Sequence, residues 1–360
     1  MTETSSVDIS LLCIGLGSSI REAMACIDSN VRGIALVVDA DRKLLGTITD
    51  GDVRHAMLNG ADLNATVELL LKRKAGGPYG KPITAPLNAD VATLLLLMQE
   101  HSVRQIPLVD QTGVVVALAT RDELLPNEVL DLQAVVMAGG FGTRLMPLTE
   151  QVPKPMLPVG SRPLLELIVE QLRSAGIRQV NVATHYKGDV ITEHFGNGQG
   201  FGVDIRYVKE DQPLGTAGAL SLLDISDEPL LVINGDILTR VDFRAMLNFH
   251  KEQNAELTVG VRQYDIHVPY GVINAEGAVV RGISEKPIVS QLINAGIYLL
   301  SPSVRRLIPN GRPYDIPELI EALLAEKRTV VCFPIREYWL DIGKADQYDQ
   351  AKADIASGRY

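Results

Sequence analysis

The sequence predicts an α/β protein in two parts: a module of two α+β repeats, followed by a mostly parallel sheet with helices on both faces. Two observations predict this division. The first 125 or so residues contain an internal repeat in which strands and helices recur in the same order. After them, apolar runs of strand length alternate with amphipathic helical segments, a pattern typical of a buried parallel sheet. With 360 residues, 46% of them hydrophobic, the chain is long enough for two cores.

Each repeat begins with a helical stretch and continues with an apolar strand, a turn, a second apolar strand and a short acidic segment that opens a helix. The helical stretches start at Ile20 and Val91. One copy alone would expose the apolar face of its sheet, whereas two copies can bury their sheets against each other. We expect a repeat module over residues 1–125, with copies at about 10–62 and 80–125.

A break in the periodicity separates the two parts. Pro126 cannot continue a helix, because proline lacks a backbone N–H and also restricts the residue before it. We therefore expect a linker at 126–131 and a second domain at 132–360.

The second domain alternates strands with helices from its start. We expect strands at Ala134–Met137, Val180–Ala183 and Leu230–Ile233, and a helix over Leu164–Ala175 that Gly176 ends. Ligands of such sheets bind at the carboxyl ends of the strands. The residues just past each strand are therefore the candidates for a functional site.

A glycine-rich run with two cations follows the first of these strands. Glycine lets the backbone turn its N–H groups toward phosphate oxygens, and Arg144 and Lys154 add positive charge where a triphosphate would lie. The run is neither a Walker A loop nor a GxGxxG motif. It predicts a phosphate-binding turn formed by Ala138, Gly139, Gly140, Gly142 and Thr143.

The segment from about Gln133 to Asp346 resembles the sugar-1-phosphate nucleotidyltransferase family, whose glycine-rich signature and Pro-Lys-Pro element, Pro153–Pro155, occur here. The resemblance implies a Rossmann-like, mostly parallel sheet sandwiched by helices. It also implies attack by a sugar-1-phosphate on the α-phosphorus of a nucleoside triphosphate, with release of pyrophosphate. No general base is expected, because a phosphate monoester with a second pKa of about 6 is largely ionised at neutral pH.

The resemblance assigns nucleoside and metal contacts to two further motifs. Gln212, Gly215 and Thr216 match the nucleoside-binding turn, where small residues let the base approach the backbone. Asp236 follows an apolar strand, and Asp341 fits the role of a second acid. Magnesium prefers one or two carboxylates together with phosphate oxygens and water, so the two aspartates are expected to hold Mg²⁺. Either aspartate alone would more often be a turn residue or a helix cap.

The resemblance also implies a sugar subsite. Glu285 would accept hydrogen bonds from sugar hydroxyls, and Lys286 would face the sugar's phosphate. Gly271 and Asn294 match the same pocket, although a glycine at a strand edge explains Gly271 nearly as well, and an exposed Glu-Lys pair is the alternative for Glu285 and Lys286. The catalytic set that the resemblance implies is Arg144, Lys154, Asp236, Lys286 and Asp341.

The repeat module resembles a pair of CBS domains, which usually form a cleft for adenine nucleotides. In that family a hydroxyl residue and an aspartate three positions later contact the ligand. Thr49 and Asp52 fit this pattern, whereas the second copy has Asp122 but Ala119 in the hydroxyl position. The alternative is that Asp52 and Asp122 are acids of a first helical turn, stabilised there without any ligand.

Charge and hydropathy exclude several other partners. The net charge of −10 argues against nucleic acid or an anionic membrane as a general partner. No basic region followed by an apolar stretch opens the chain, and no run approaches the roughly 18 apolar residues that a spanning helix needs. We expect a cytoplasmic protein.

The substrates stay open at this point. The segment after Asp341 is too short for the left-handed β-helix of some relatives. A CBS pair before such a short form resembles the glucosamine-1-phosphate guanylyltransferases of legionaminate-type pathways, which favours GTP and glucosamine-1-phosphate. Mannose- or heptose-1-phosphate, and uridylyl or thymidylyl transfer, are alternatives. An adenine-nucleotide sensor with an inactive transferase domain is the non-enzyme alternative. The CBS pair suggests a homo-oligomer, either as a nucleotide-binding module or as a dimerisation scaffold alone.

Overall fold

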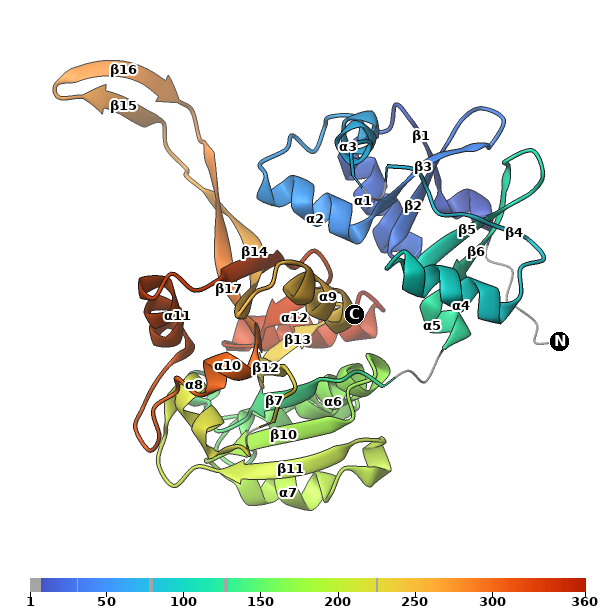
Figure 1. Cartoon of the computed structure of the whole chain (residues 1–360). Coiled ribbons are helices and arrows are strands. Elements are labelled where there is room, and N and C mark those ends of the chain that lie inside the picture. The colour runs from blue at the N-terminus through green and yellow to red at the C-terminus, as the bar shows by residue number, and fades with distance from the viewer. Residues whose placement is uncertain (1–7, 31, 78–79, 126–128, 225) are drawn as a thin grey trace. The chain divides into compact units, whose positions relative to one another are not determined.

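The computed structural model describes residues 8–30, 32–77, 80–125, 129–224 and 226–360 (Figure 1). Its chain forms two compact units, Met1–Glu128 and Val129–Tyr360. The boundary falls within the predicted linker, of which residues 126–128 lie outside the described residues. Among the described residues, no helix has both the length and the apolar character needed to cross a bilayer.

The N-terminal unit contains two three-stranded sheets of the same topology. In each, the first strand pairs in parallel with the second, and the second pairs antiparallel with the third. The first sheet has the order β1-β2-β3 and the second β4-β5-β6. The elements are η1 Ile9–Leu12, β1 Cys13–Gly15, α1 Ile20–Asn30, β2 Ile34–Val38, β3 Leu44–Thr49, α2 Asp50–Leu58, α3 Val67–Lys74, β4 Ala85–Pro86, α4 Val91–Glu100, β5 Gln105–Val109, β6 Val115–Thr120 and α5 Arg121–Leu124.

The two repeats bury apolar side chains against each other, as the sequence predicts. Ile34 and Leu36 of the first repeat share a buried cluster with Val115 of the second. An isolated bridge between Lys43 and Val114 joins the turns of the two sheets. Neither sheet would have this cover alone, so the pair of repeats is the folding unit.

The strand register corrects the alignment of the two repeats. Ile34 pairs with Thr49 in the first sheet, and Gln105 pairs with Thr120 in the second. Thr120 is therefore the counterpart of Thr49, and not Ala119 as the sequence comparison assumed. The error is one residue, which the apolar pattern of a short buried strand does not resolve.

The C-terminal unit is built on a seven-stranded sheet of order β11-β10-β7-β12-β17-β14-β18. Among its described strands β17 alone runs antiparallel to its neighbours, so the sheet is mostly parallel as predicted. The elements up to the fourth strand in this order are β7 Gln133–Met137, η2 Thr143–Leu145, η3 Lys154–Met156, β8 Pro158–Val159, β9 Arg162–Pro163, α6 Leu164–Ser174, β10 Gln179–Thr184, α7 Gly188–Phe195, η4 Gln199–Phe201, β11 Asp204–Lys209, α8 Gly215–Gly218, η5 Ala219–Leu222 and β12 Leu230–Asn234. The remaining elements are β13 Ile237–Thr239, α9 Phe243–Glu252, β14 Leu257–His267, β15 Val272–Glu276, β16 Val279–Ser284, β17 Ile288–Leu300, α10 Pro302–Arg305, α11 Ile316–Ala325, β18 Val330–Pro334, β19 Trp339–Asp341 and α12 Ala345–Ala356.

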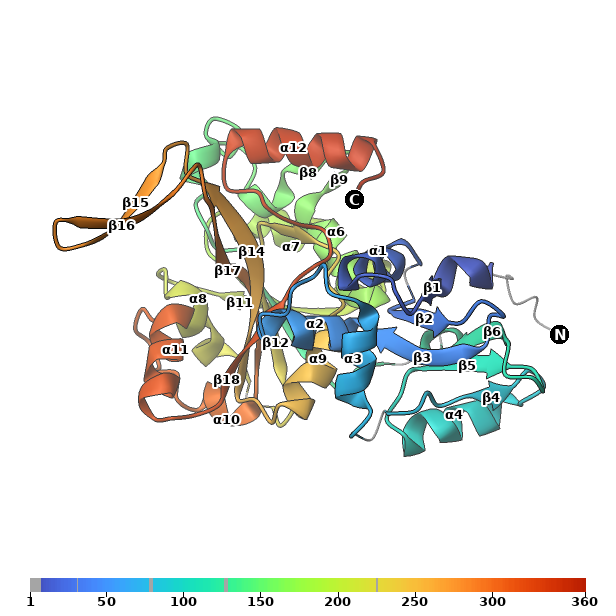
Figure 2. The ribbon, with the colours of Figure 1, turned by 90° about the horizontal axis from the view of Figure 1, so that it is seen from above.

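Helices cover both faces of this sheet (Figure 2). Alternate residues of β12 belong to different cores: Leu231 and Ile233 pack with α6, α9 and α12, whereas Leu230 and Val232 pack with α10 and α11. Such alternation follows from the two-residue period of a strand. The sheet is therefore buried on both faces, and a site is expected at the carboxyl ends of its strands.

A long two-stranded arm extends from the sheet (Figure 1). We define the arm as residues 262–293, the outer parts of β14 and β17 with the hairpin β15–β16 at its end. The β14–β17 ladder continues through it to the pair His267 and Ile288. Most of its side chains are exposed, including Tyr270 at 75% and Ile283 at 65%. Beyond the root, the arm is held by its own ladder and not by a core.

Candidate active site at the strand ends

The glycine-rich turn follows β7 and needs glycine at one position in particular. Gly142 has a φ of +64°, and a Cβ there would lie 2.8 Å from Cγ2 of Thr149. The Thr149 hydroxyl also donates a hydrogen bond to the Gly142 carbonyl, at 2.9 Å. A left-handed residue pressed against a side chain excludes larger residues. The contacts with Thr149 therefore hold this turn in place. At Gly140, by contrast, no atom lies within 4 Å of the position that an added Cβ would take.

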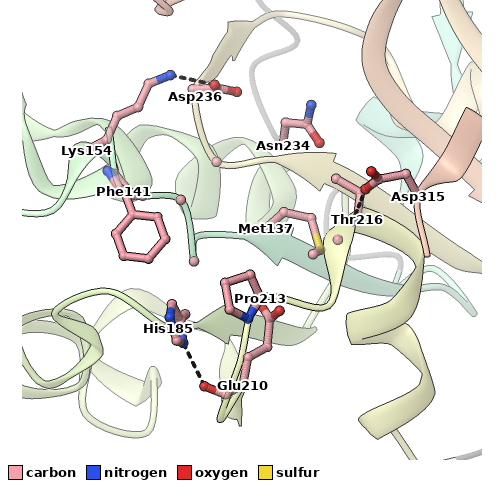
Figure 3. A pocket seen from close by; sticks show the side chains of 15 residues that line it. Met137, Phe141, Lys154, His185, Glu210, Pro213, Thr216, Asn234, Asp236 and Asp315 are labelled. Atoms are coloured by element: carbon pink, nitrogen blue, oxygen red, sulfur yellow. Dashed lines mark hydrogen bonds and ion pairs between the residues drawn. The ribbon is translucent and has the colours of Figure 1, made fainter. Parts of the chain in front are cut away.

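A cavity of about 310 Å³ opens beside this turn (Figure 3). Figure 3 shows Lys154 and Asp236 on one side of it, His185 and Glu210 on another, and Thr216 beside Asp315. Six predicted residues line the cavity: Gly139, Gly140, Lys154, Gly215, Thr216 and Asp236. Ala138, Gly142, Thr143, Arg144, Gln212, Gly271, Glu285, Lys286, Asn294 and Asp341 are not among its lining residues.

Lys154 and Asp236 form an ion pair at the cavity wall. The Lys154 Nζ lies 2.5 Å from Oδ2 of Asp236, and the two side chains are 11% and 26% exposed. Lys154 is the first residue of the 3₁₀ turn η3 and follows Pro153. Asp236 lies between β12 and β13. A cation held this way by a carboxylate is fixed in place before any anion arrives.

Asp341 lies beside Asp236 on the neighbouring strand. Strand β19 pairs with β13 so that Asp341 is opposite Ile237, and the Ile342 N–H donates to the Asp236 carbonyl at 2.9 Å. Burial raises the pKa of Asp341, and the negative charge of Asp236 raises it further, while Lys154 and Arg144 lower it. Two carboxylates that repel each other in a half-buried place are a suitable pair for a divalent cation. No described cluster of three or more His, Cys, Asp or Glu residues could hold a metal by itself. Such an ion would therefore need oxygens from a substrate or water.

The turn at α8, which is predicted to contact the nucleoside, is hydrogen-bonded to the segment before α11. The Thr216 N–H donates to Oδ1 of Asp315 at 2.9 Å, and the Gly218 N–H donates to the Tyr314 carbonyl at 2.7 Å. Gly215 has a φ of +75°, and a Cβ there would lie 2.9 Å from the Tyr314 carbonyl oxygen. Only glycine fits this position. The turn is therefore rigid, and Asp315 is a cavity residue that sequence reasoning missed.

Glu210 is the missed residue with the most chemical consequence. It follows β11, is 6% exposed and lines the cavity, whereas Gln212 is exposed and lies outside the lining. Its Oε2 accepts the Leu214 N–H at 2.9 Å, and its Oε1 lies 3.0 Å from the Cβ position of Gly139. One carboxylate oxygen is thus used to fix the side chain, and the other lies beside the glycine-rich turn.

Three lining residues that sequence reasoning missed lie at the ends of strands. His185, Glu210 and Asn234 stand at or just after the ends of β10, β11 and β12, where ligands of such sheets bind. Oδ1 of Asn234 is buried without a hydrogen-bond partner among the described residues. Inspection of every strand end, and not only of the family motifs, could have found these three. The remaining missed lining residues are Met137, Phe141, Pro155, Pro213 and Gly235.

The predicted sugar residues lie on or near the arm. Gly271 and Glu285 are neighbours, since a Cβ on Gly271 would lie 3.0 Å from Oε2 of Glu285. Lys286 follows with a φ of +44° and is exposed. Asn294 lies at the root, opposite Val261 in the ladder, and its Oδ1 accepts the Gly296 N–H at 3.0 Å. The structure therefore brings Gly271 and Glu285 together but does not bring the arm residues into the cavity.

In the N-terminal unit, Thr49 and Asp52 are occupied by the fold itself. They form a capping box at the start of α2, and Oδ2 of Asp52 also accepts a hydrogen bond from the Lys74 Nζ at 2.8 Å. Asp122 forms an ion pair with Arg104. Such contacts are those of first-turn acids, the alternative that the sequence left open.

The counterpart of Asp52 in the second repeat is Glu123 and not Asp122. The Thr120 hydroxyl donates to Oε2 of Glu123 at 2.9 Å, and the Glu123 N–H donates to the Thr120 oxygen at 3.3 Å. Both repeats therefore keep a threonine followed by an acid three residues later. The sequence reading that the second copy lacks the hydroxyl is wrong.

The fold and cavity define an α/β domain that combines a glycine-rich turn, a lysine and a pair of carboxylates at its strand ends. The nucleotidyl transferase family model matches residues 133–358, and the chain belongs to this family, whose members generally use a divalent metal. The CBS domain model matches residues 7–59 and 80–127.

Curated relatives match this chain over its C-terminal part. The mannose-1-phosphate guanyltransferase of Yarrowia lipolytica is 35% identical over 226 residues, which are 60% of this chain and 62% of that protein. The mannose-1-phosphate guanylyltransferase of Mycobacterium tuberculosis is 34% identical over 63% of this chain and 65% of its own. The chain thus spans less than two thirds of the length of these relatives.

Two solved structures share the fold of the C-terminal unit. A candidate glucose-1-phosphate thymidylyltransferase from Bacillus anthracis, solved with sucrose, is 28% identical with a TM-score of 0.51 and covers 62% of this chain and 94% of its own. HddC from Yersinia pseudotuberculosis is 25% identical with a TM-score of 0.50 and covers 62% and 99%.

Proposed function

We propose that this chain transfers a guanylyl group from GTP to a sugar-1-phosphate, with release of pyrophosphate. The observation that carries the proposal is the arrangement at the sheet edge. Lys154 is held by Asp236, Asp341 stands on the paired strand, and the glycine-rich turn adjoins them. Fixed charges beside a glycine-rich turn suit a reaction between two phosphorylated substrates.

In the proposed reaction, a phosphate oxygen of the sugar-1-phosphate attacks the α-phosphorus of GTP. A new P–O bond forms there, the bond to the oxygen that bridges the α- and β-phosphorus breaks, and its electron pair leaves with pyrophosphate. Arg144, Lys154 and Lys286 would reduce the repulsion between the two anions. When bound, Mg²⁺ would supply further positive charge beside the phosphate oxygens, with Asp236 and Asp341 as its protein ligands.

The preference for GTP rests on the Glu210 carboxylate. Guanine presents two adjacent donors, N1–H and the N2 amino group, and a carboxylate is an acceptor only. Uracil and thymine present one N–H between two carbonyl oxygens, which a carboxylate would repel. Glu210 is buried and lines the cavity beside Gly139, where a hydrogen bond to its carboxylate is stronger than in bulk water. The names of the curated relatives support the same donor.

The choice of acceptor sugar rests on the relatives. The relatives above are named for mannose-1-phosphate, which was one of the alternatives from the sequence, and not for glucosamine-1-phosphate. Mannose-1-phosphate is therefore the first acceptor to test, followed by glucosamine-1-phosphate.

The deciding experiment is a pyrophosphate-release assay on the full chain with Mg²⁺. GTP, UTP, dTTP, CTP and ATP are each combined with mannose-, glucosamine-, glucose- and heptose-1-phosphate. Release with GTP that depends on one sugar phosphate supports the proposal and names the acceptor. Release only with a pyrimidine nucleotide contradicts the assignment of Glu210, and no release with any pair favours a nucleotide sensor.

For the N-terminal unit we propose binding of an adenine nucleotide, on the strength of the CBS match. Calorimetric titration of AMP, ADP and ATP into the full chain tests it, with T120A as the variant for the second repeat. Absence of heat with all three nucleotides would leave the module as a scaffold. A homo-oligomer and a cytoplasmic location stay predictions from the sequence.

A further inference from the structure

Arg262 begins the arm, and its side chain reaches back to the segment that precedes Asp341. Its Nη1 donates hydrogen bonds to the backbone oxygens of Ile335, at 3.1 Å, and Glu337, at 2.7 Å. Burial lowers the pKa of Arg262, an effect that the charge of Glu337 opposes. A guanidinium placed in a poorly solvated position needs such partners, so the link is a built contact and not a chance surface pair.

The segment that Arg262 holds leads directly to the metal-site carboxylates. Two residues after Glu337, strand β19 begins at Trp339 and ends at Asp341. The Trp339 Nε1–H donates to the Ala295 carbonyl at 2.9 Å, and the Ile342 N–H donates to the Asp236 carbonyl at 2.9 Å. The carboxylate pair and the segment 335–337 are therefore joined by a short, hydrogen-bonded stretch of chain.

The same arginine stands at the point where the arm leaves the sheet. In the β14–β17 ladder Arg262 is opposite Ile293, next to the pair Val261 and Asn294. Outward from this point most side chains are exposed, and inward from Ala295 they are buried. At the root of the arm, the hydrogen bonds of Arg262 connect the arm to Ile335 and Glu337, which belong to neither of its own two strands.

We infer that Arg262 is a positioning residue that fixes the orientation of the arm, and thereby of Glu285 and Lys286, relative to Asp236 and Asp341. The inference rests on the proposed function, in which the arm residues hold the sugar phosphate and the aspartates hold the metal. A long two-stranded element gains its direction from its root, so a small rotation there displaces its far residues by several ångströms. Misplacement of a substrate group by about 1 Å can cost about 100-fold in rate.

The test compares R262M with R281M in the full chain. Arg281 lies near the far end of the arm, where its side chain is 62% exposed and pairs with Glu276, so it receives the same substitution without the root contacts. Pyrophosphate release is measured while each substrate is varied in turn. For R262M we expect the KM for the sugar phosphate to rise about 10- to 100-fold, with the KM for GTP changed less than about 2-fold; R281M should match the wild type. R262K, which keeps a donor on a shorter side chain, should recover part of the loss.

A purely structural role would give a different result. It would lower kcat through loss of folded enzyme, with both KM values unchanged, and that outcome overturns the inference. So would an equal rise in both KM values.

Trp339 supplies a second measurement that needs no turnover, because it is the only tryptophan of the chain. Acrylamide quenching of its emission should increase in R262M and stay at the wild-type value in R281M. Unchanged quenching in R262M contradicts the contact on which the inference depends. If the wild type releases no pyrophosphate with any substrate pair, the proposed function fails, and the quenching result still decides whether Arg262 holds the segment before Asp341.

Discussion

The cavity and the arm share two strands but are held by different amounts of surrounding protein. The inner half of β17, from Ala295, is buried in the sheet, whereas its outer half, from Ile288 to Leu292, is exposed. Around the cavity, the Lys154 side chain is 11% exposed and paired with Asp236, and Glu210 is 6% exposed and accepts the Leu214 N–H. On the arm, Lys286 and Glu285 are exposed. In our proposal the groups that meet the base and phosphates of GTP are therefore fixed by the core, and those that meet the sugar depend on the arm's root.

The largest expected effect comes from the carboxylate at the cavity wall. D236N removes the partner of Lys154 and one of two metal-binding carboxylates, so pyrophosphate release should fall at least about 100-fold. The circular dichroism spectrum should be unchanged. D346N, the same change at an exposed aspartate, is the control. Wild-type release by D236N at saturating Mg²⁺ would remove Asp236 from the site.

A pair of substitutions in one strand tests how differently the two regions are held. Ile297, in the inner part of β17, is fully buried in the core on one face of the sheet. Ile288, in the outer part of the same strand, is 57% exposed. I297A should lower the free energy of unfolding by about 2–5 kcal/mol through loss of contacts and creation of a cavity. I288A should change it by less than about 0.5 kcal/mol. Chemical denaturation measures both. Equal losses would mean that the arm is packed against something in solution.

The donor preference is expected to depend on one atom of the Glu210 side chain. E210Q replaces a carboxylate oxygen by an amide NH₂ of nearly the same shape, so it leaves the fold intact. A hydrogen bond to a charged group contributes about 1.5–3 kcal/mol. The kcat/KM for GTP should therefore fall about 10- to 100-fold, while that for UTP rises. A parallel loss with both donors would indicate that Glu210 only supports the turn at Leu214.

The smallest effect concerns a buried histidine of helix α9, which packs on the sheet. His250 bonds Oγ1 of Thr258 at 2.8 Å and Oγ of Ser301 at 2.9 Å, and burial lowers its pKa from 6.5 to about 4. Between these values the unfolded chain binds a proton that the folded chain does not. The contribution of His250 to the free energy of unfolding should thus be fully present above pH 6.5. It should fall by about 1.4 kcal/mol per pH unit as the pH decreases toward 4. H250Q should lack this component in denaturation measured across that range. The same slope in both proteins would contradict the assignment.

The sequence could predict the parts of this molecule that depend on local pattern. The alternation of apolar runs and helices gave the two-faced sheet, and the Gly-rich run gave the turn beside Lys154. These features are set by residues close to one another in the chain. The presence of two repeats follows for the same reason, since each copy carries its own pattern of strands and helices.

What the sequence could not predict depends on register and on distant contacts. Gln212 and Glu210 are two residues apart, and only the path of the chain after β11 decides which of them lies in the cavity. Thr120 was missed by a one-residue shift that strand pairing alone reveals. Arg262 has no motif at all, because its role lies in two carbonyl oxygens more than seventy residues later.

The corrected pairing in the N-terminal unit has a consequence for the order of folding. Asp52 is paired with Lys74, which is on α3, a helix that packs against strand β3 of the first repeat. Glu123 of the second repeat is paired instead with Arg32 of the first. The first cap can therefore form as soon as its own repeat and α3 are made, whereas the second gains its cation only when both repeats have docked. During synthesis from the N-terminus, all partners of the first cap would therefore be available before those of the second, although the shared core closes only when both repeats are present.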